Sequence, residues 1–238
     1  MENTNFNITQ GQVQDGSIAK TFIANVFSWM GLALAITAIV SYKFGTDISY
    51  LRLLISETGM TGLGYVVMFA PIGFVLLMSL GFQRLSSTAL IALFLVYAVI
   101  MGMSLSFIFL VYTHGSIFQT FGIAAGMFGL MAVLGYTTNT DLTKFGSILL
   151  MGLVGIIIAS LVNMFMHSSQ MSYIISFLGV LIFTGLTAYD VQKLKRIGAG
   201  VEHGTEATSK LSIMGALTLY LDFINLFLML LRLFGNRK

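Results

Sequence analysis

Long apolar stretches alternate with short polar ones along nearly the whole chain. A helix rises about 1.5 Å per residue, so a hydrocarbon core of about 30 Å requires roughly 20 apolar residues per crossing. Seven stretches approach or exceed this length, at residues 21–42, 63–80, 88–112, 117–136, 145–165, 173–189 and 211–234. They lack the strict alternation of apolar and polar residues found in membrane β-barrels. We therefore predict an all-α polytopic membrane protein with seven transmembrane helices.

The polar stretches between these segments define the domain organisation. The first 20 residues are rich in Asn and Gln and lack a basic start followed by an apolar run, so we expect a polar tail there and not a signal peptide. We predict a polar cytoplasmic tail at 1–20, one seven-helix domain at 21–235 and a short basic tail at 236–238. The connection at 43–62 is either a plain polar loop or a short interfacial helix that begins after Asp47, a candidate N-cap.

Composition strengthens the membrane interpretation. Of the 238 residues, 57% are apolar and only 9% are charged, whereas soluble domains carry about 25% charged residues. The absence of Cys excludes disulfides. The net charge of +3 is spread over the whole chain, which argues against a nucleic-acid partner and leaves the lipid bilayer as the main surroundings.

The basic residues indicate an orientation. With seven crossings, the amino-terminal side carries seven Lys and Arg residues: Lys20, Arg84, Lys144, Lys193, Lys195, Arg196 and Lys210. The opposite side carries Lys43, Arg52, Arg232, Arg237 and Lys238. The positive-inside rule then predicts a cytoplasmic amino terminus. The basic end of the chain opposes this orientation unless the last stretch is a re-entrant hairpin, although its length favours a full crossing.

One acidic residue lies deep in the last stretch. Asp222 is at a depth where an ionised Asp costs about 2.5 to 3.5 kcal/mol on insertion scales. Thr218 and Asn225 follow the same helical face, at i−4 and i+3 from Asp222. We expect this polar face to point into the bundle or into a cavity.

A second acid, Asp190, is placed to meet Asp222. Residues equally far from a turn lie at similar depth in an antiparallel helix pair, and the polar stretch around Glu206 is midway between the two acids. This requires the sixth helix to continue to about Ile197, with Gly198 as its stop. Facing carboxylates can share a proton as a switch, can begin a transient Ca²⁺ site, or can simply hydrogen-bond to neighbouring helices.

Two other features have alternative interpretations. Arg84, between the second and third stretches, either reaches inward to a carboxylate or marks the cytoplasmic edge of the membrane. Gly122 and Gly126 form a GxxxG pair that lets two helix backbones approach. We expect this pair to pack within the bundle rather than to form a seam between two copies of the chain.

The residues around both acids carry a family resemblance. The segments FTGLTAYDVQKLK (183–195), LYLDFINLF (219–227) and LLRLFG (230–235) closely resemble the Bax inhibitor-1, or transmembrane BAX inhibitor motif, family in its bacterial YccA-like branch. The segments 84–90 and 101–109 look like that branch as well. The resemblance extends over about residues 21–235, and the two Asp-bearing motifs together are fairly specific.

This resemblance implies a bundle whose last helix is central and surrounded by the other six. It also implies a pH-sensitive Ca²⁺ leak channel in which an aspartate pair, here Asp190 and Asp222, senses pH. In the family a basic residue near the end of the second helix is tied to gating, and Arg84 is its nearest match. Some bacterial relatives instead modulate a membrane protease, for which this chain shows no recognisable motif.

Other seven-helix chemistries do not fit the residues. A retinal protein needs a Lys within the last helix, and none lies between Lys210 and Lys238. Zinc catalysis needs clustered ligands, but His114, His167 and His203 fall in loops on both sides. We expect no enzymatic activity and no cofactor. Two functions remain: a proton-regulated cation leak that acts on Ca²⁺, or a non-transporting regulator that binds another membrane protein such as a protease.

Overall fold

In the part of the chain that the computed structural model describes, seven helical spans are long and apolar enough to cross a membrane. The structure describes residues 3–57, 59–202 and 204–238, with side-chain surroundings from residue 19 onward. The spans are Ala19–Thr46 of α1 (Asn3–Thr46), α3 (Gly62–Gly81), α4 with α5 (Ser87–Leu105 and Ile108–Val111), α6 (His114–Thr137), α7 (Thr143–Met166), α8 (Ser169–Ala199) and α9 (Glu206–Phe234). They match the seven predicted stretches one to one, which confirms the all-α polytopic fold.

Side-chain caps explain where most of these helices begin. Five helices start after a Ser or Thr whose hydroxyl accepts a hydrogen bond from the backbone N–H three residues later: Thr61, Ser86, Thr113, Ser168 and Thr205. The predicted short helix after Asp47 is confirmed as α2 (Ile48–Leu54), with the Asp47 carboxylate accepting from the Ser49 N–H at 2.9 Å. The antiparallel strands β1 (Ile55–Ser56) and β2 (Gly59–Met60) then lead into α3.

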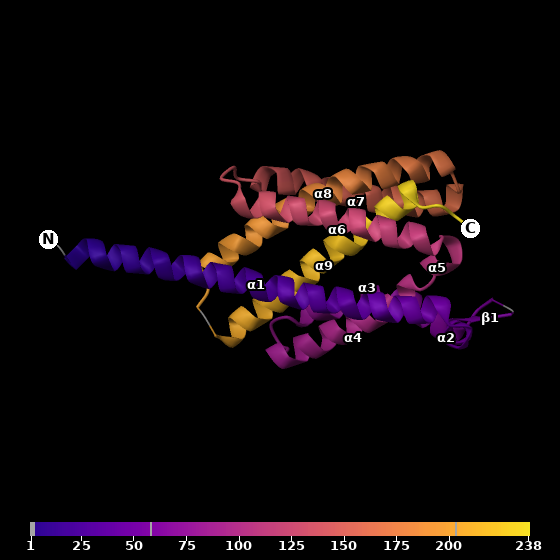
Figure 1. Cartoon of the computed structure of the whole chain (residues 1–238), viewed down its shortest axis with the longest axis horizontal. Coiled ribbons are helices and arrows are strands. Elements are labelled where there is room, and N and C mark those ends of the chain that lie inside the picture. Colours follow the sequence, from indigo (N-terminus) through magenta and orange to yellow (C-terminus); the bar gives the residue numbers. More distant parts are fainter. Residues whose placement is uncertain (1–2, 58, 203) are drawn as a thin grey trace.

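The last helix is the centre of the bundle. Figure 1 shows α9 running obliquely between one group of helices, α6, α7 and α8, and another, α1, α3 and α4. In its most apolar window 67% of the residues are buried, against 39% or less in every other span. Its main neighbours are α1, α4, α6 and α8, whereas α3 packs mainly on α4 and α7 mainly on α8. The predicted central position is confirmed, but four helices rather than six form the principal ring.

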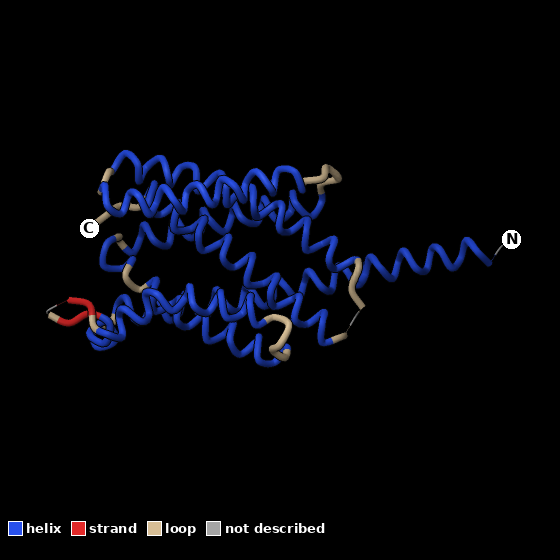
Figure 2. The backbone as a smooth tube through the Cα atoms, turned by 180° about the vertical axis from the view of Figure 1, so that it is seen from behind, coloured by secondary structure: helices blue, strands red, loops and turns tan. Residues whose placement is uncertain are grey.

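The last helix also crosses the bundle completely. The two ends of the chain lie at opposite ends of the molecule, as the tube in Figure 2 shows, so the re-entrant alternative is wrong. The residues beyond α9 bind along the connection between α5 and α6. The Lys238 N–H donates to the Val111 carbonyl at 2.9 Å, the Thr113 N–H donates to the Asn236 carbonyl at 3.0 Å, and Lys238 Nζ donates to the Phe109 carbonyl at 2.7 Å.

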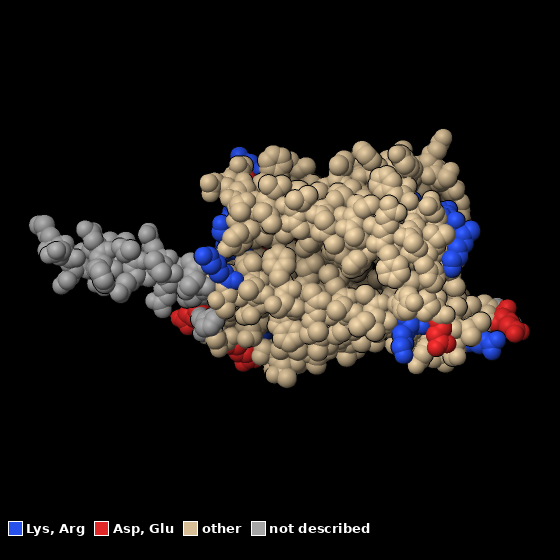
Figure 3. Space-filling model, in the orientation of Figure 1, with Lys and Arg blue, Asp and Glu red and all other residues tan. Residues whose placement is uncertain are grey.

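The face of the protein seen in Figure 3 carries its charged side chains at the two ends. In Figure 3 the Lys, Arg, Asp and Glu side chains on the visible face gather at the two ends, and a broad apolar band separates them. The membrane-spanning helices expose many large apolar side chains, including Phe69, Leu130 and Ile158. Such a band suits contact with lipid tails and would be an aggregation surface in water.

The glycines of α6 differ from our expectation. A methyl group added at Gly122 or Gly126 would meet no other atom within 4 Å, and both residues are exposed. The prediction that this GxxxG pair packs within the bundle is therefore wrong, because α6 turns this face away from its neighbours. The close approach between helices involves Gly135 instead. A Cβ added at Gly135 would overlap the backbone of Ala188 in α8.

This contrast gives a matched pair of substitutions. We expect Gly135→Ala to destabilise the protein, because the new methyl group forces α6 and α8 apart and such overpacking costs about 1 to 3 kcal/mol. Gly126→Ala adds the same group in open space and should leave stability unchanged or slightly higher. The melting temperatures of both purified variants can be measured from the loss of the monodisperse peak in size-exclusion chromatography after heating. Equal melting temperatures would contradict the α6–α8 contact.

Candidate functional site

Two buried carboxyl groups meet at the interface between α8 and α9. Asp190 of α8 is 9% exposed and Asp222 of α9 is 5% exposed. Their carboxyl groups lie within hydrogen-bonding reach of each other. A hydrogen bond between two carboxyls requires a proton on one of them. The structure thus brings together the two acids singled out from the sequence, and their arrangement is suited to sharing a proton.

The turn between α8 and α9 lies slightly before its predicted centre. α8 reaches Ala199, which confirms its predicted continuation to about Ile197, but its cap is Gly200 and not Gly198, which packs against the Phe22 side chain. Glu206, the predicted midpoint, is instead the first residue of α9, where it accepts a hydrogen bond from the Ser87 N–H at 3.2 Å. The acids still meet, because α9 crosses the bundle obliquely (Figure 1).

Two glycines hold α8 and α9 close together on either side of the acids. An added Cβ at Gly215 of α9 would lie 2.6 Å from the Leu194 side chain of α8. An added Cβ at Gly179 of α8 would lie 2.8 Å from the Met229 side chain of α9. Along α8, Asp190 lies between these two contacts. Small residues at helix contacts permit close approach in lipid, and here they set the distance between the carboxyls.

The acid pair lies on the wall of a cavity of about 600 Å³. α7, α8 and α9 line it, and most of the lining is apolar. Its polar residues are Ser160, Asp190, Thr218, Asp222 and Asn225. The face predicted from the spacing of the last three therefore does point into a cavity, as expected for polar groups in a membrane span.

The supporting polar residues are partly engaged by their own helix. The Thr218 hydroxyl donates to the Met214 carbonyl at 3.0 Å, and Asn225 Nδ2 donates to the Leu221 carbonyl at 2.8 Å. Their donors are thus turned back to the backbone. The side-chain oxygens remain as acceptors on the cavity side of α9.

One oxygen of the pair is left without a partner. Asp222 Oδ2 is buried and accepts no hydrogen bond from any residue that the structure describes. The basic residue whose charge acts on Asp190 is Lys193, which is exposed further along α8. Within the described ranges, the ion pairs are Arg196 with Asp141 and Lys210 with Glu206, so neither acid of the pair has a cationic partner.

Arg84 does not join the site. It lies in the turn between α3 and α4, where its backbone N–H donates to the Gly81 carbonyl at 2.9 Å, and its side chain is exposed. No salt bridge links it to an acid in the part of the chain that the structure describes. Of the two interpretations of this residue, its position fits the edge of the membrane.

Gln192 and Arg196 of α8 form hydrogen bonds to residues 140–142, which precede α7. We call this group of contacts the polar latch; it was not predicted from the sequence. Gln192 Oε1 accepts from the Leu142 N–H at 2.9 Å, and Gln192 Nε2 donates to the Thr140 carbonyl at 2.8 Å. Arg196 donates to Asp141 Oδ1 at 2.6 Å. Gln192 and Arg196 are four residues apart on one face of α8, which is the only trace of this latch in the sequence.

The other end of α7 is fastened as well. Asn163 Nδ2 donates to Ser172 Oγ at 2.8 Å, and the Ser168 N–H donates to Asn163 Oδ1 at 3.1 Å. His167 ends the helix in the left-handed conformation, with φ of 52°. α7 is therefore held at both ends, and the cavity with the acid pair lies along its middle.

The latch predicts a pH-dependent difference in stability. Hydrogen bonds from Thr143 and Arg196 hold the pKa of Asp141 well below its ordinary value of 3.8. A lowered pKa stabilises the fold above the ordinary pKa, and this contribution is lost as the pH falls below it. We expect Asp141→Asn to lower the melting temperature slightly near neutral pH, with the difference shrinking below about pH 4. Melting curves of both proteins across pH measure this; a difference that stays constant with pH would contradict it.

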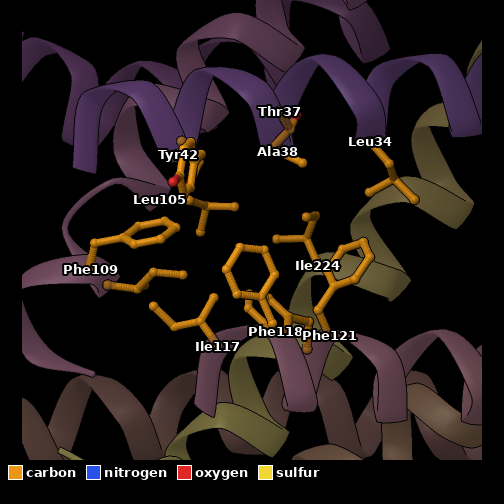
Figure 4. A pocket seen from close by; sticks show the side chains of 13 residues that line it. Leu34, Thr37, Ala38, Tyr42, Leu105, Phe109, Ile117, Phe118, Phe121 and Ile224 are labelled. Atoms are coloured by element: carbon orange, nitrogen blue, oxygen red, sulfur yellow. The ribbon is translucent and has the colours of Figure 1, made fainter. Parts of the chain in front are cut away.

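A second, smaller cavity is of a different kind. It measures about 180 Å³ and lies between α1, α5, α6 and α9 (Figure 4). The aromatic rings of Tyr42, Phe109, Phe118 and Phe121 surround it, and no Asp, Glu, Lys, Arg or His lines it. It therefore offers no chemistry comparable to that of the acid pair.

The described residues contain no group of three or more His, Cys, Asp or Glu side chains that could hold a metal ion. His114 begins α6 and His167 ends α7, and His203 lies outside the described residues. The acid pair supplies two carboxyls, whereas a closed Ca²⁺ site takes about six to eight oxygen ligands.

Comparisons with known proteins show the family of the chain. Residues 19–238 match the sequence pattern of the family described as "Inhibitor of apoptosis-promoting Bax1". The chain belongs to this Bax inhibitor-1 family. It is 44% identical over 227 residues to the inner membrane protein YbhL of Escherichia coli, covering 95% of this chain and 96% of that protein. It is also 46% identical over 225 residues to an uncharacterized protein of Borreliella burgdorferi, covering 94% and 96% of the two chains.

Proposed function

We propose that this Bax inhibitor-1 family protein is a pH-sensitive cation leak channel, gated by Asp190 and Asp222, that passes Ca²⁺. The observation that supports this proposal is the meeting of two carboxyl groups on the wall of a cavity inside the membrane-spanning bundle. Intramembrane acids are costly, and they commonly mark ion or proton pathways.

Proton exchange at the pair provides the gating step. One shared proton joins the two carboxyls, whereas two ionised carboxylates in a medium of low dielectric constant repel each other. The repulsion acts between α8 and α9, and α9 fills the centre of the bundle. A change in the protonation of the pair therefore changes the seal formed by the most buried helix.

The transported ion is expected to stay partly hydrated. Asp190 and Asp222 provide carboxylate oxygens, and Thr218 and Asn225 add two side-chain oxygens on the same cavity wall. This is fewer than the about six to eight oxygens that Ca²⁺ prefers. Water fills the remaining positions, so that the pair acts as a transient site and releases the ion easily.

A liposome assay tests the proposal. The full chain is reconstituted with a Ca²⁺ dye inside, and flux is compared between about pH 6 and about pH 8. We expect the flux to depend on pH for the unmodified chain. Asp190→Asn and Asp222→Asn should remove this dependence, because Asn keeps the shape of Asp but does not ionise.

The control is Glu202→Gln, which neutralises an exposed acid in the turn between α8 and α9. It should leave both the flux and its pH dependence unchanged. Flux equal to that of protein-free liposomes, or an unaltered pH profile in both Asn variants, would contradict the leak.

The alternative is a non-transporting regulator that binds another membrane protein, such as a protease. The observation that favours it is the exposed glycine face of α6, where Gly122 and Gly126 meet no other described residue. A partner helix packs closely against such a face in lipid. If the reconstituted chain gives no Ca²⁺ flux, the result contradicts the leak and favours this second function.

We further propose that the protein lies in a bacterial inner membrane, like the relative YbhL, with a cytoplasmic amino terminus. Since the chain has no Cys, single substitutions report on orientation. An impermeant maleimide should label Glu57→Cys, in the connection between β1 and β2, on cells with a permeabilised outer membrane. It should label Glu202→Cys only after the inner membrane is opened; the reverse pattern would invert the orientation.

A further inference from the structure

The cavity beside the acid pair has the form of a binding site for an amphipathic molecule. One wall is apolar along α7, with Leu150, Leu153, Ile157 and Leu161 facing the same space. The opposite wall carries the two carboxyls of α8 and α9. Its volume of about 600 Å³ lies within the about 300 to 1,000 Å³ of small-molecule sites, which typically combine apolar walls with a few polar groups.

The cavity is reached from the lipid side of the bundle. Two of its α7 residues, Ile157 and Leu161, are 51% and 56% exposed. Only 11% of the most apolar window of α7 is buried, the lowest value of the seven spans. These exposed residues lie in the apolar band of a membrane-spanning helix, so a molecule that enters beside them arrives from hydrocarbon. It must therefore carry a substantial apolar part.

The charge of the site selects the polar part. A carboxyl pair that shares one proton keeps one negative charge. No Lys, Arg or His lines the cavity, so no side chain in its wall balances this charge. A cationic hydrogen-bond donor on the ligand would balance it. A neutral acyl chain would leave the charge unbalanced.

We propose that the cavity between α7, α8 and α9 binds a protonated lipophilic amine. Its ammonium group donates to the Asp190–Asp222 carboxyl pair, and its apolar chain lies along Ile157 and Leu161 of α7. This site goes beyond the proposed leak and does not depend on it, because binding requires only the cavity and the carboxyl pair.

The test uses tryptophan fluorescence. The chain has a single Trp, Trp29 on α1, so Trp29→Phe combined with Ile157→Trp creates a sole reporter at the cavity. The protein is placed in phosphatidylcholine liposomes and titrated with 12-bromododecylamine, whose bromine quenches nearby indole. The matched neutral probe is 12-bromododecanol, which has the same chain and no charge. We expect saturable quenching by the amine at concentrations roughly tenfold lower than any quenching by the alcohol.

A reporter outside the cavity separates binding from partitioning into lipid. Ile123→Trp in the same Trp29→Phe background places the reporter on α6. Ile123 is as far from the start of α6 as Ile157 is from the end of α7, and the two residues are 43% and 51% exposed. There the amine and the alcohol should quench alike and without saturation.

Two substitutions at the pair complete the test. Asp190→Asn combined with Asp222→Asn removes both carboxyl groups, and with them any negative charge of the pair, and should shift saturation by the amine to roughly tenfold higher concentrations, toward the behaviour of the alcohol. If that double variant does not fold, as its melting curve will show, Asp222→Asn alone replaces the carboxyl on α9 by an amide and should shift saturation in the same direction by a smaller factor. Equal quenching of the cavity reporter by both probes, or amine quenching that both Asn variants leave unchanged, would overturn the proposal. Ca²⁺ flux does not enter this measurement, so failure of the leak leaves its outcome unaffected.

Discussion

A carboxyl group buried in hydrocarbon needs a polar partner that replaces its lost contacts with water. The packing of the helices around α9 provides such a partner for Asp222. Its partner is Asp190, and the two acids are brought together by the close contact of α8 and α9. Glycines at positions 179 and 215 permit that contact, because an added Cβ there would run into the Met229 and Leu194 side chains. Asp222 belongs to α9, which is the most buried span. One half of the polar pair is therefore carried by the central helix of the bundle.

The sequence predicts those features that hydrocarbon dictates directly. The thickness of the bilayer sets the length of each apolar stretch, so all seven spans follow from counting residues. Helical periodicity places Thr218, Asp222 and Asn225 on one face, and that face does line a cavity. The turn lies slightly before the midpoint Glu206, because equal depth from a turn holds for parallel axes and α9 is oblique.

Contacts between side chains far apart in the sequence remain beyond such reasoning. The latch of Gln192 with the α6–α7 connection depends on which helix lies beside α8. The Thr37 hydroxyl shares a hydrogen bond of 2.7 Å with the Tyr220 hydroxyl and joins α9 to α1 on another face. Glycines are equally ambiguous, since Gly135 meets a backbone and Gly126 meets open space. In each case the neighbour, and not the residue type, decides the role.

The central place of α9 has a consequence for how the protein is made. α9 follows the other six spans in the chain, so it enters the membrane after the helices that surround it have been synthesised. Asp190 lies on the span made immediately before. If α8 and α9 insert as one hairpin, the two carboxyls can pair during insertion, and neither has to cross the hydrocarbon alone. For such a hairpin, the order of the spans along the chain lowers the barrier to placing an acid in the membrane.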